Sequence, residues 1–386
     1  MGNLVVVGGG YAGALAAVRA RRSLDEGQVV TLVSDRDVLV ERIRNHQLAA
    51  GQTLRRVSLR ELMAEAGVEL VIGRMTGLDV ARSEIVVDGR VLGYARLILA
   101  PGSRATVAVE GKEHVFSLEV ESSARLAARL TAGVGRLLVV GGGLCGIEAA
   151  TELAEAYPLT NVTLVSRDPV DKLLAPGAGR HLRRVLARLG VTVLEGAGVT
   201  ALTEGSAALS DGRAVSFDAC LWAGGFVASS LAASVGLPTN GIGQVPVDAR
   251  LHAADNVYVV GDAACLTASA GSPVEMSCRS AMPMGAHAAD NAVAAMQGRQ
   301  ELPFRYRELG ICISLGRHDA IVQTRRSDDG RPGWLWLGGR LGAGVKEWIC
   351  KYTVGSIEKE AGRRQKYRWL ASKPEANKGP RRLTAS

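Results

Sequence analysis

The sequence predicts an α/β protein in which one strand–turn–helix–strand unit occurs twice. The first copy begins with LVVVGGGYAGALAA, from Leu4 to Ala17, and the second with LLVVGGGLCGIEAA, from Leu137 to Ala150. A further strand-like run follows each copy, VTLVSDRD in the first and VTLVSRDP in the second. The apolar runs suit strands that are buried on both faces of a parallel sheet. A repeated unit with its whole context is far more informative than an isolated glycine motif.

Length and composition agree with this fold class. The chain has 386 residues, of which 47% are hydrophobic and 47 are glycine, and this suits two or three domains with many tight turns. No apolar run reaches the roughly 18 residues that a membrane span needs. Strand-like sequence begins at Asn3, which leaves no room for a signal peptide. We therefore expect a cytoplasmic protein.

Three glycines in each unit have roles that the chemistry of a bound dinucleotide predicts. The first permits the tight turn after the strand, the second lets a pyrophosphate approach the backbone, and the third lets the helix lie against the strand. The helix N-terminus then offers unpaired N–H groups to the phosphates. In this order of roles the equivalent glycines are Gly8 and Gly141, Gly10 and Gly143, and Gly13 and Gly146. We expect their neighbours Tyr11, Ala12 and Leu144 to contact the nucleotides as well.

The residues that end the second strand of each unit indicate which nucleotide it takes. An acid there accepts hydrogen bonds from ribose hydroxyls, whereas an arginine accommodates a 2′-phosphate. The first unit has Ser34-Asp35-Arg36, which suits an unphosphorylated ribose such as that of FAD. The second has Ser166-Arg167, which favours NADPH. A shift of one residue in the strand boundary would bring Asp168 into play and favour NADH.

A third strand-end signal follows the repeat. Residues Asp255 to Ala264, DNVYVVGDAA, indicate a buried strand that ends in Gly261-Asp262. With the two glycine units, this pattern resembles the two-dinucleotide-binding flavoproteins of the pyridine nucleotide-disulfide oxidoreductase superfamily. The resemblance implies that the Asp262 carboxylate accepts hydrogen bonds from the flavin ribityl chain, and capping of the next helix is the alternative role. It also implies cofactor contacts at Arg42 and at two strand-end turns, Ala100-Pro101-Gly102 and Ala223-Gly224-Gly225.

The order of these motifs predicts two Rossmann-like three-layer dinucleotide-binding domains and a small C-terminal α+β domain. Residues 1–108 and 239–300 would form a discontinuous FAD domain, because the first glycine unit and the Gly-Asp strand belong together in the resemblance. Residues 109–238 would be inserted into it as the NAD(P)H domain. Residues 301–370 would form an interface domain with strands at Gly310 to Leu315 and Asp319 to Gln323 and then a helix, and 371–386 a basic flexible tail.

The cysteines narrow the chemistry. Six of them are scattered along the chain without a CxxC or CxxxxC spacing. This argues against a structural zinc site and against a local redox disulfide, so we expect free thiols and no metal. The disulfide reductases of the superfamily are thereby excluded.

The remaining resemblance is to type II NADH dehydrogenases. The flavin-side segment of that family ends in a pattern that Gln47-Leu48-Ala49-Ala50-Gly51 matches, which implies that His46 and Gln47 lie near the isoalloxazine. For His46, a surface or structural role is the alternative. The family also carries a glutamate facing the nicotinamide where this chain has Glu148, and an acid in the first helical turn also complements the helix dipole.

One motif of that family is altered in this chain. The quinone-side motif AQxAxQQG, aligned on Gly285, meets CRSAMPMG, so that its glutamines are replaced by Arg279, Pro283 and Met284. Pro283 would fit the first position of a helix. We expect this helix start, with Met282 and Pro283, to contact the flavin and to stabilise negative charge on it. The nature of the electron acceptor is left open by the same substitutions.

The C-terminal segment is basic and carries an apolar stripe. From Arg340 onward twelve Lys/Arg stand against four Asp/Glu. Val345, Trp348, Ile349 and Tyr352 fall at helical spacing, and we predict that they face the core, with contact to an anionic membrane as the alternative. The basic surface could equally be a solubilising tail or attract an acidic redox protein. We expect no nucleic-acid partner.

Together these observations predict an FAD-dependent NAD(P)H oxidoreductase. Hydride would pass from the nicotinamide to the flavin and on to a quinone-like or other small acceptor. Two alternatives stay open, a soluble flavoprotein reductase of a metabolite or small redox protein, and a redox-sensing binding protein resembling apoptosis-inducing factor. A homodimer is a further expectation that rests on the resemblance alone.

Overall fold

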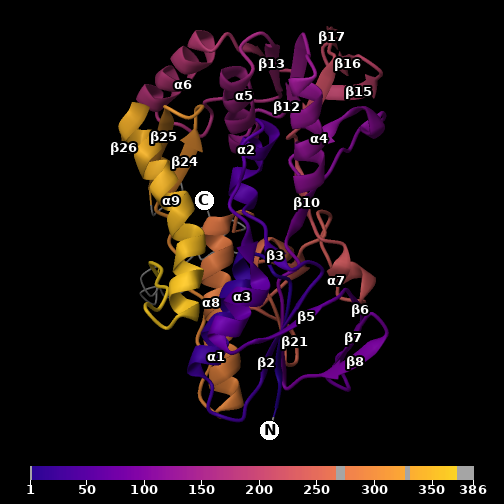
Figure 1. Cartoon of the computed structure of the whole chain (residues 1–386), viewed down its shortest axis with the longest axis vertical. Coiled ribbons are helices and arrows are strands. Elements are labelled where there is room, and N and C mark those ends of the chain that lie inside the picture. The colour runs from indigo at the N-terminus through magenta and orange to yellow at the C-terminus, as the bar shows by residue number, and fades with distance from the viewer. Residues whose placement is uncertain (1, 267–273, 327–330, 372–386) are drawn as a thin grey trace, which may run out of the picture.

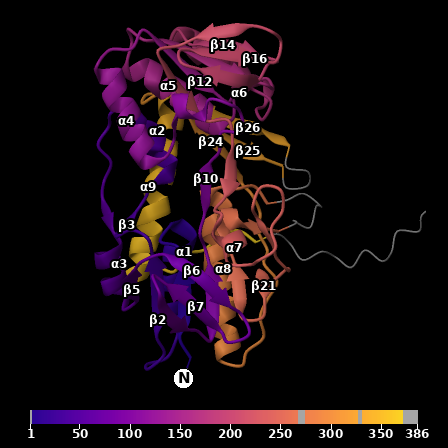
Figure 2. The same cartoon turned by 90° about the vertical axis from the view of Figure 1, so that its right-hand side faces the viewer.

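The computed structural model describes residues 2–266, 274–326 and 331–371. Two α/β blocks lie along the long axis of the molecule, the first repeat in the lower block and the second in the upper block (Figures 1 and 2). The predicted α/β class, with two parallel sheets, is confirmed. Within the described ranges, no helix has the length and hydropathy to cross a bilayer. The predicted tail, 371–386, lies outside the described residues apart from its first residue.

A six-stranded sheet forms the lower block, in the order β21-β22-β9-β1-β2-β5. β1, β2, β5, β9 and β22 run parallel, and β21 is antiparallel to β22. All four residues of β1 are buried in the centre of the sheet, where α1 packs against this strand. The strands span Leu4–Val7 (β1), Val30–Ser34 (β2), Glu69–Ile72 (β5), Arg96–Leu99 (β9), His252–Ala254 (β21) and Val257–Val259 (β22).

Helices α1 (Tyr11–Ser23) and α8 (Cys278–Met296) lie side by side against this sheet. Gly285 permits this close approach, because a Cβ at that position would overlap the Ala12 carbonyl oxygen. The shorter helices α3 (Leu59–Ala66) and α7 (Leu231–Ser234) also belong to this block, whereas α2 (Asn45–Ala49) packs against two helices of the upper block, Val120–Thr131 (α4) and Leu144–Ala156 (α5). Because its strands come from both sides of the second repeat, this sheet supports the proposed discontinuous first domain.

The upper block contains a five-stranded parallel sheet in the order β11-β18-β12-β13-β14. Its central strand β12 repeats β1, and α5 repeats α1. Its strands span Phe116–Ser117 (β11), Arg136–Val140 (β12), Asn161–Ser166 (β13), Thr192–Glu195 (β14) and Ala219–Trp222 (β18). The helices span Val120–Thr131 (α4), Leu144–Ala156 (α5) and Pro176–Arg188 (α6).

Short strands decorate both blocks. The antiparallel pair of Ser103–Ala105 (β10) and Phe226–Ala228 (β19) links the two blocks. The other short strands span Val38–Leu39 (β3), Val57–Ser58 (β4), Met75–Asp79 (β6), Glu84–Val87 (β7), Arg90–Gly93 (β8), Val199–Thr203 (β15), Ser206–Leu209 (β16), Ala214–Ser216 (β17), Val245–Pro246 (β20) and Ala264–Cys265 (β23).

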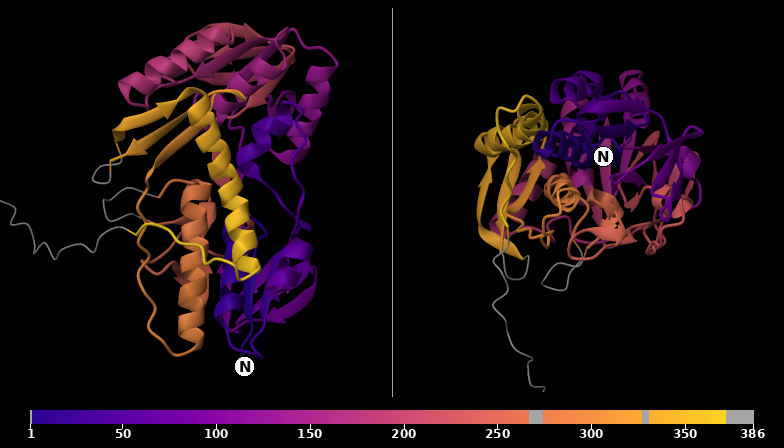
Figure 3. Two further views of the ribbon diagram at one scale, coloured as in Figure 1. Left: turned by 60° about the vertical axis from the view of Figure 1, so that its left-hand side comes forward. Right: turned by 90° about the horizontal axis from the view of Figure 1, so that it is seen from below.

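The C-terminal part is a three-stranded antiparallel sheet followed by a long helix. The sheet contains β24 (Gly310–Ser314), β25 (Ala320–Arg325) and a third strand that was not predicted, β26 (Pro332–Gly338). Helix α9 (Gly339–Ala361) starts beside this sheet under the upper block and runs down along α1 and α3 of the lower block (Figure 3). One helix therefore spans both blocks.

The prediction that the apolar stripe of α9 faces the core is wrong. Trp348 is 63% exposed, and Val345, Ile349 and Tyr352 are only half-buried. The buried face includes smaller side chains and one lysine, namely Gly342, Lys346, Cys350, Thr353, Val354, Ser356 and Ile357. The physical reason is close packing against α1 and β25, which favours small side chains over the bulky apolar stripe.

The predicted helix start at Pro283 is also wrong. α8 begins at Cys278, and the Ser277 hydroxyl caps it by accepting a hydrogen bond from Ser280 N at 3.3 Å. Pro283 is therefore the sixth helical residue, where its missing N–H leaves the Arg279 carbonyl without its usual helical partner. The serine cap, rather than the proline, decides where this helix begins.

Candidate functional site

The two glycine turns have the same geometry. Gly8 and Gly141 both adopt a φ of 113°, which only glycine reaches without strain. A Cβ on Gly8 would overlap the Ala100 carbonyl, and one on Gly141 would lie 2.6 Å from the Ala223 carbonyl oxygen. Each first glycine thus lets the strand-end turn of a neighbouring strand pass directly beneath it. The third glycines, Gly13 and Gly146, leave no room for a Cβ because the helix lies on the turn.

The second glycines face open space. No heavy atom lies within 4 Å of a Cβ built on Gly10 or on Gly143. Both residues are the N-caps of their helices, α1 and α5, and neither helix has a side-chain cap. The free N–H groups of the first turn and the room in front of them fit a pyrophosphate in each unit.

One cavity lies beside the first glycine turn and the first turn of α5. It collects residues from the FAD-side turns, from the first turn of α5, from the start of α8 and from α9. Of the predicted site residues it is lined by Gly10, Tyr11, Ala12, Arg42, His46, Ala100, Gly102, Glu148, Gly261 and Asp262. Further lining residues that the sequence did not single out include Ile43, Ser103, Leu118, Cys145, Phe226, Met276, Ser277, Cys278 and Lys346.

Three parts of the chain bring ionisable groups together in the cavity wall. Glu148 on α5 accepts hydrogen bonds from Lys346 Nζ at 2.8 Å and from Ser314 N at 3.0 Å. The other carboxylate oxygen lies 3.9 Å from His46 Nδ1, on α2. All three side chains are at least nine-tenths buried relative to full exposure. This Glu148–Lys346–His46 cluster therefore joins three helices, α5, α9 and α2, that lie far apart in the sequence.

The cluster sets the charge of each member. Burial alone would raise the pKa of Glu148, but Lys346 and His46 outweigh it and hold that pKa below its usual value. Burial would lower the pKa of Lys346, and the Glu148 carboxylate instead raises it well above its usual value. Burial lowers the pKa of His46 to about 4, against the opposing attraction of Glu148. At neutral pH the cluster is thus a carboxylate, an ammonium and an uncharged imidazole.

His46 has one unused polar atom. Its Nε2 is buried and has no hydrogen-bond partner within the described chain, although the residue lines the cavity. A buried polar atom without a partner costs free energy unless something else binds it. The imidazole is therefore suited to a hydrogen bond with a group held in the cavity. Gln47 does not line the cavity, and its side-chain oxygen accepts a hydrogen bond from Arg44 at 3.2 Å.

The predicted flavin-side polar groups form a connected set. The Ser103 hydroxyl donates to the Asp262 carboxylate at 2.6 Å, and Arg42 donates to the Ser103 carbonyl. Arg42 also lies 3.6 Å from Glu119. This arrangement places one carboxylate and one guanidinium in the cavity beside the first glycine turn, where a ribityl chain and a pyrophosphate fit.

The other predicted contacts lie away from the cavity wall. Met282 and Pro283 are buried inside α8 and do not line it. Pro101 and Leu144 are neighbours in sequence of lining residues, whereas the turn Ala223-Gly224-Gly225 and the second-unit glycines Gly141, Gly143 and Gly146 do not line the cavity. At the ends of β2 and β13, the Ser34 and Ser166 hydroxyls donate to the backbone within their own turns. Asp35 is exposed and lies 3.4 Å from Arg36 and 3.6 Å from Arg74.

Lys346 is the main residue that sequence reasoning missed. The signal was present, because Lys346 stands between Gly342 and Cys350 at four-residue spacing, on a helix face of small residues. A lysine on such a face is buried when the helix packs closely, and it then needs an acid partner. The large apolar residues nearby instead predicted that a different face of the helix is buried.

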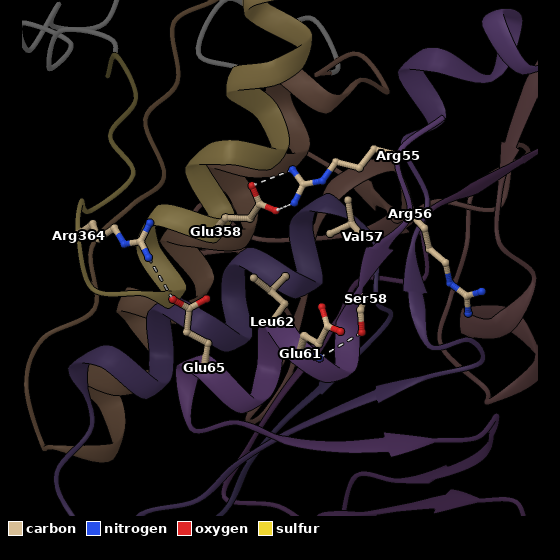
Figure 4. A pocket seen from close by; sticks show the side chains of 9 residues that line it. All are labelled: Arg55, Arg56, Val57, Ser58, Glu61, Leu62, Glu65, Glu358 and Arg364. Carbon is tan, nitrogen blue, oxygen red and sulfur yellow. Dashed lines mark hydrogen bonds and ion pairs between the residues drawn. The ribbon is translucent and has the colours of Figure 1, made fainter. Parts of the chain in front are cut away.

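A second hollow lies between α3 and α9 (Figure 4). Its arginines are paired, since Arg55 binds Glu358 and Arg364 lies 3.8 Å from Glu65. These contacts join the end of α9 to α3 and leave no unpaired buried group in the hollow. We therefore place the chemistry in the first cavity.

All six cysteines are free thiols. Burial raises the pKa of Cys145, which lines the cavity, to about 12, and that of Cys278 to about 11. Both are therefore protonated at neutral pH. Within the described residues, no group of three or more His, Cys, Asp and Glu side chains is placed to hold a metal ion.

The two equivalent glycine turns, with the first of them and the start of α5 at one cavity, fit a two-nucleotide flavoprotein oxidoreductase. The sequence matches the pyridine nucleotide-disulphide oxidoreductase family over residues 2–294, and the chain belongs to that family. The family implies FAD and a nicotinamide nucleotide as cofactors. Within it the chain is similar to NADH dehydrogenase-like and quinone-reducing members.

Known relatives agree with this assignment. An NADH dehydrogenase-like protein of Mycobacterium tuberculosis is 28% identical, with 83% of this chain and 87% of the relative covered. The demethylphylloquinone reductase of Synechocystis is 23% identical, with 83% and 86% covered. The structure of the sulfide:quinone oxidoreductase of Aquifex aeolicus shares the fold with a TM-score of 0.80, at 17% identity and with 93% and 92% covered.

Proposed function

We propose that the protein takes a hydride from NADPH or NADH and passes two electrons through FAD to a small acceptor. The observation that carries this is the cavity beside the first glycine turn and the start of α5, with the Glu148–Lys346–His46 cluster in its wall. FAD, when bound, supplies the hydride-accepting and electron-transferring chemistry. The first turn, Arg42 and Asp262 would hold FAD, and the second turn would hold the nicotinamide nucleotide.

The residues of the cluster have separate proposed roles. Glu148, kept ionised by Lys346, can accept a hydrogen bond from the carboxamide N–H of a nicotinamide and so orient the ring. His46, uncharged, can donate or accept one hydrogen bond at its free Nε2 in the cavity. Gln47 acts indirectly by holding Arg44, which also binds Glu347 on α9. Fixing distance and orientation in this way is the main contribution of the protein to hydride transfer.

We propose a quinone-like acceptor. The similarity to a demethylphylloquinone reductase along most of both chains supports this choice. The second candidate is a small acidic redox protein, which would bind the basic C-terminal segment. The similarity to the ferredoxin reductase component of a chlorobenzene dioxygenase, 29% identical with 68% of this chain and 67% of that one covered, supports this alternative.

We also propose that the C-terminal sheet and α9 meet an anionic membrane surface. Trp334, Leu341 and Trp348 are 86%, 73% and 63% exposed, and Leu335 beside them is 54% exposed. Exposed tryptophans next to lysines and arginines suit the membrane interface. Co-sedimentation with anionic vesicles is expected for the native protein and is expected to weaken in Trp334→Ser/Trp348→Ser. Equal pelleting of both proteins would contradict this proposal.

Anaerobic stopped-flow reduction tests the proposed reaction. We expect the FAD-loaded protein to lose its flavin absorbance on mixing with NADPH or NADH. Glu148→Gln should slow this step by about 10- to 100-fold, because the carboxylate orients the donor. Glu121→Gln, an exposed glutamate of α4, is the matched control and should keep the native rate. A flavin that neither nucleotide reduces would contradict the enzymatic proposal and favour a sensing role.

A further inference from the structure

The ends of β2 and β13, where a nucleotide ribose is expected, have the same local arrangement of hydrogen bonds. In the first unit the Ser34 hydroxyl donates to Arg36 O at 2.8 Å, and in the second the Ser166 hydroxyl donates to Asp168 O at 2.5 Å. Both serines are buried, Ser34 against Gly9 and Ser166 against Gly142. The next residue is therefore presented in the same way in both units. That residue is Asp35 in the first unit and Arg167 in the second.

The acidic residues near Arg167 form ion pairs with other cations. β13 ends at Ser166, so the boundary shift that would have brought Asp168 into play does not occur. The Asp168 carboxylate lies 3.0 Å from Lys172. Asp171 and Glu195 both bind Arg183, at 2.8 and 3.0 Å. Each of these acids lies beside a cation, and none of them occupies the position directly after Ser166 that Asp35 occupies after Ser34.

Arg167 itself is available. Among the described residues, its guanidinium has no hydrogen bond and no ion pair. Its aliphatic stem lies over Gly198, since a Cβ there would come within 2.8 Å of Arg167 Cγ. The glycine thus lets the stem lie flat on the loop after β14. An exposed arginine with a supported stem and no acid partner is well suited to bind a phosphate, whose geometry matches the guanidinium.

We propose that Arg167 forms a subsite for the 2′-phosphate of NADPH, so that the second unit takes NADPH in preference to NADH. This inference rests on the proposed function, because it assigns the donor of the same site. The internal repeat supplies the contrast: Asp35 in the same frame suits the unphosphorylated ribose of FAD and would repel a phosphate. A single position therefore distinguishes the two nucleotides of one chain.

A binding measurement tests the subsite without turnover. The FAD-loaded, oxidised protein is titrated calorimetrically with adenosine 2′,5′-bisphosphate and with adenosine 5′-monophosphate, which differ only in the 2′-phosphate. We expect the native protein to bind the bisphosphate at least tenfold more tightly. Arg167→Ala should abolish this preference, and Arg167→Lys should keep part of it. Arg167→Asp, which gives the second unit the Ser-Asp pair of the first, should reverse it.

Arg299→Ala is the control for the loss of one positive charge. Arg299 lies in the lower block after α8, where its guanidinium binds Gln297, and the variant should keep the native preference. Equal affinity of the native protein for both probes, or an unchanged preference in Arg167→Ala, would overturn the proposal. Preference for the bisphosphate together with a flavin that NADPH does not reduce would instead leave the subsite standing and contradict the proposed reaction.

Discussion

The contact between Lys346 and Glu148 decides the charge of the cavity wall. Both side chains are about nine-tenths buried, and each is the principal countercharge of the other. Lys346→Met would leave the carboxylate buried with only the Ser314 N–H and a neutral imidazole beside it. We expect this variant to lose about 3–5 kcal/mol of unfolding free energy in urea titrations.

The double variant Glu148→Gln/Lys346→Met should recover much of this loss, because it buries no isolated charge. Lys351→Met, one helical turn later and 73% exposed in its side chain, is the matched control. Its stability should stay within about 0.5 kcal/mol of the native value. Losses that simply add in the double variant would show that the buried pair is not coupled.

His46 predicts a dependence of stability on pH. Its pKa is lowered to about 4 in the folded protein from an ordinary value of 6.5. Between these values the unfolded chain binds a proton that the folded chain does not, so the folded state loses stability as pH falls from 6.5 toward 4. The contribution is of the order of 3 kcal/mol over this window.

His46→Gln should flatten this part of the pH–stability profile, whereas His114→Gln, at a partly exposed site, should leave it unchanged. The measurement is the unfolding free energy in urea at several values of pH. An unchanged slope in His46→Gln would mean that other groups cause the acid sensitivity.

At the scale of elements, two glycines of the second turn have different roles, Gly146 in helix packing and Gly143 in the proposed nucleotide binding. A Cβ at Gly146 would overlap the Gly141 carbonyl and push α5 off the turn, so Gly146→Ala should destabilise the protein by at least about 2 kcal/mol. Gly143 has a φ of −73° and open space around it. Gly143→Ala should therefore fold with near-native stability but weaken nicotinamide nucleotide binding, as measured by the dependence of flavin reduction on nucleotide concentration. Equal stability of both variants would contradict this reading.

Helix α9 gives a second prediction at this scale. Ile357 is fully buried on the face that packs against α1, and Trp348 is 63% exposed. Ile357→Ala should lose about 2–5 kcal/mol of unfolding free energy through the cavity it leaves. Trp348→Ala should change it by less than about 0.5 kcal/mol. The opposite ranking in urea titrations would restore the apolar stripe as the core face.

The elements also show what the sequence can and cannot predict. The glycine turns and their strands were predictable because a turn, its strand and its helix obey local rules of backbone conformation. The inward face of α9 was not, because neighbours distant in sequence select it. Gly342 and Cys350 face inward since α1 and β25 leave room only for small side chains. The start of α8 was misplaced because an alignment on Gly285 outweighed the capping signal of Ser277.

At the scale of the whole molecule, α9 joins the blocks at the cavity. Successive residues of this helix bind different partners, Lys346 to Glu148 on α5 and Glu347 to Arg44, just before α2, at 2.9 Å, and the helix also packs against α1 of the lower block. We expect the FAD-loaded protein to unfold in one transition, with flavin release and loss of far-UV circular dichroism at the same urea concentration. Flavin release well before the loss of secondary structure would show that the blocks separate first.

The site as a whole was only partly predictable for the same reason. His46, Glu148 and Asp262 were each named from short motifs, and all three line the cavity. The pairing of Glu148 with Lys346 was not predictable, because a contact between residues about 200 positions apart leaves no periodic trace in one sequence.

The separation between Glu148 and Lys346 also has a consequence for biosynthesis. Chains are made from the N-terminus at about 5–20 residues per second, and domains begin to fold as they emerge. Glu148 leaves the ribosome long before Lys346, which lies in the last part of the chain. The upper block therefore emerges with its buried carboxylate still lacking a countercharge, and the nascent protein cannot complete the wall of the cavity until Lys346 has emerged. Premature termination would then yield a chain with both glycine turns and no finished site.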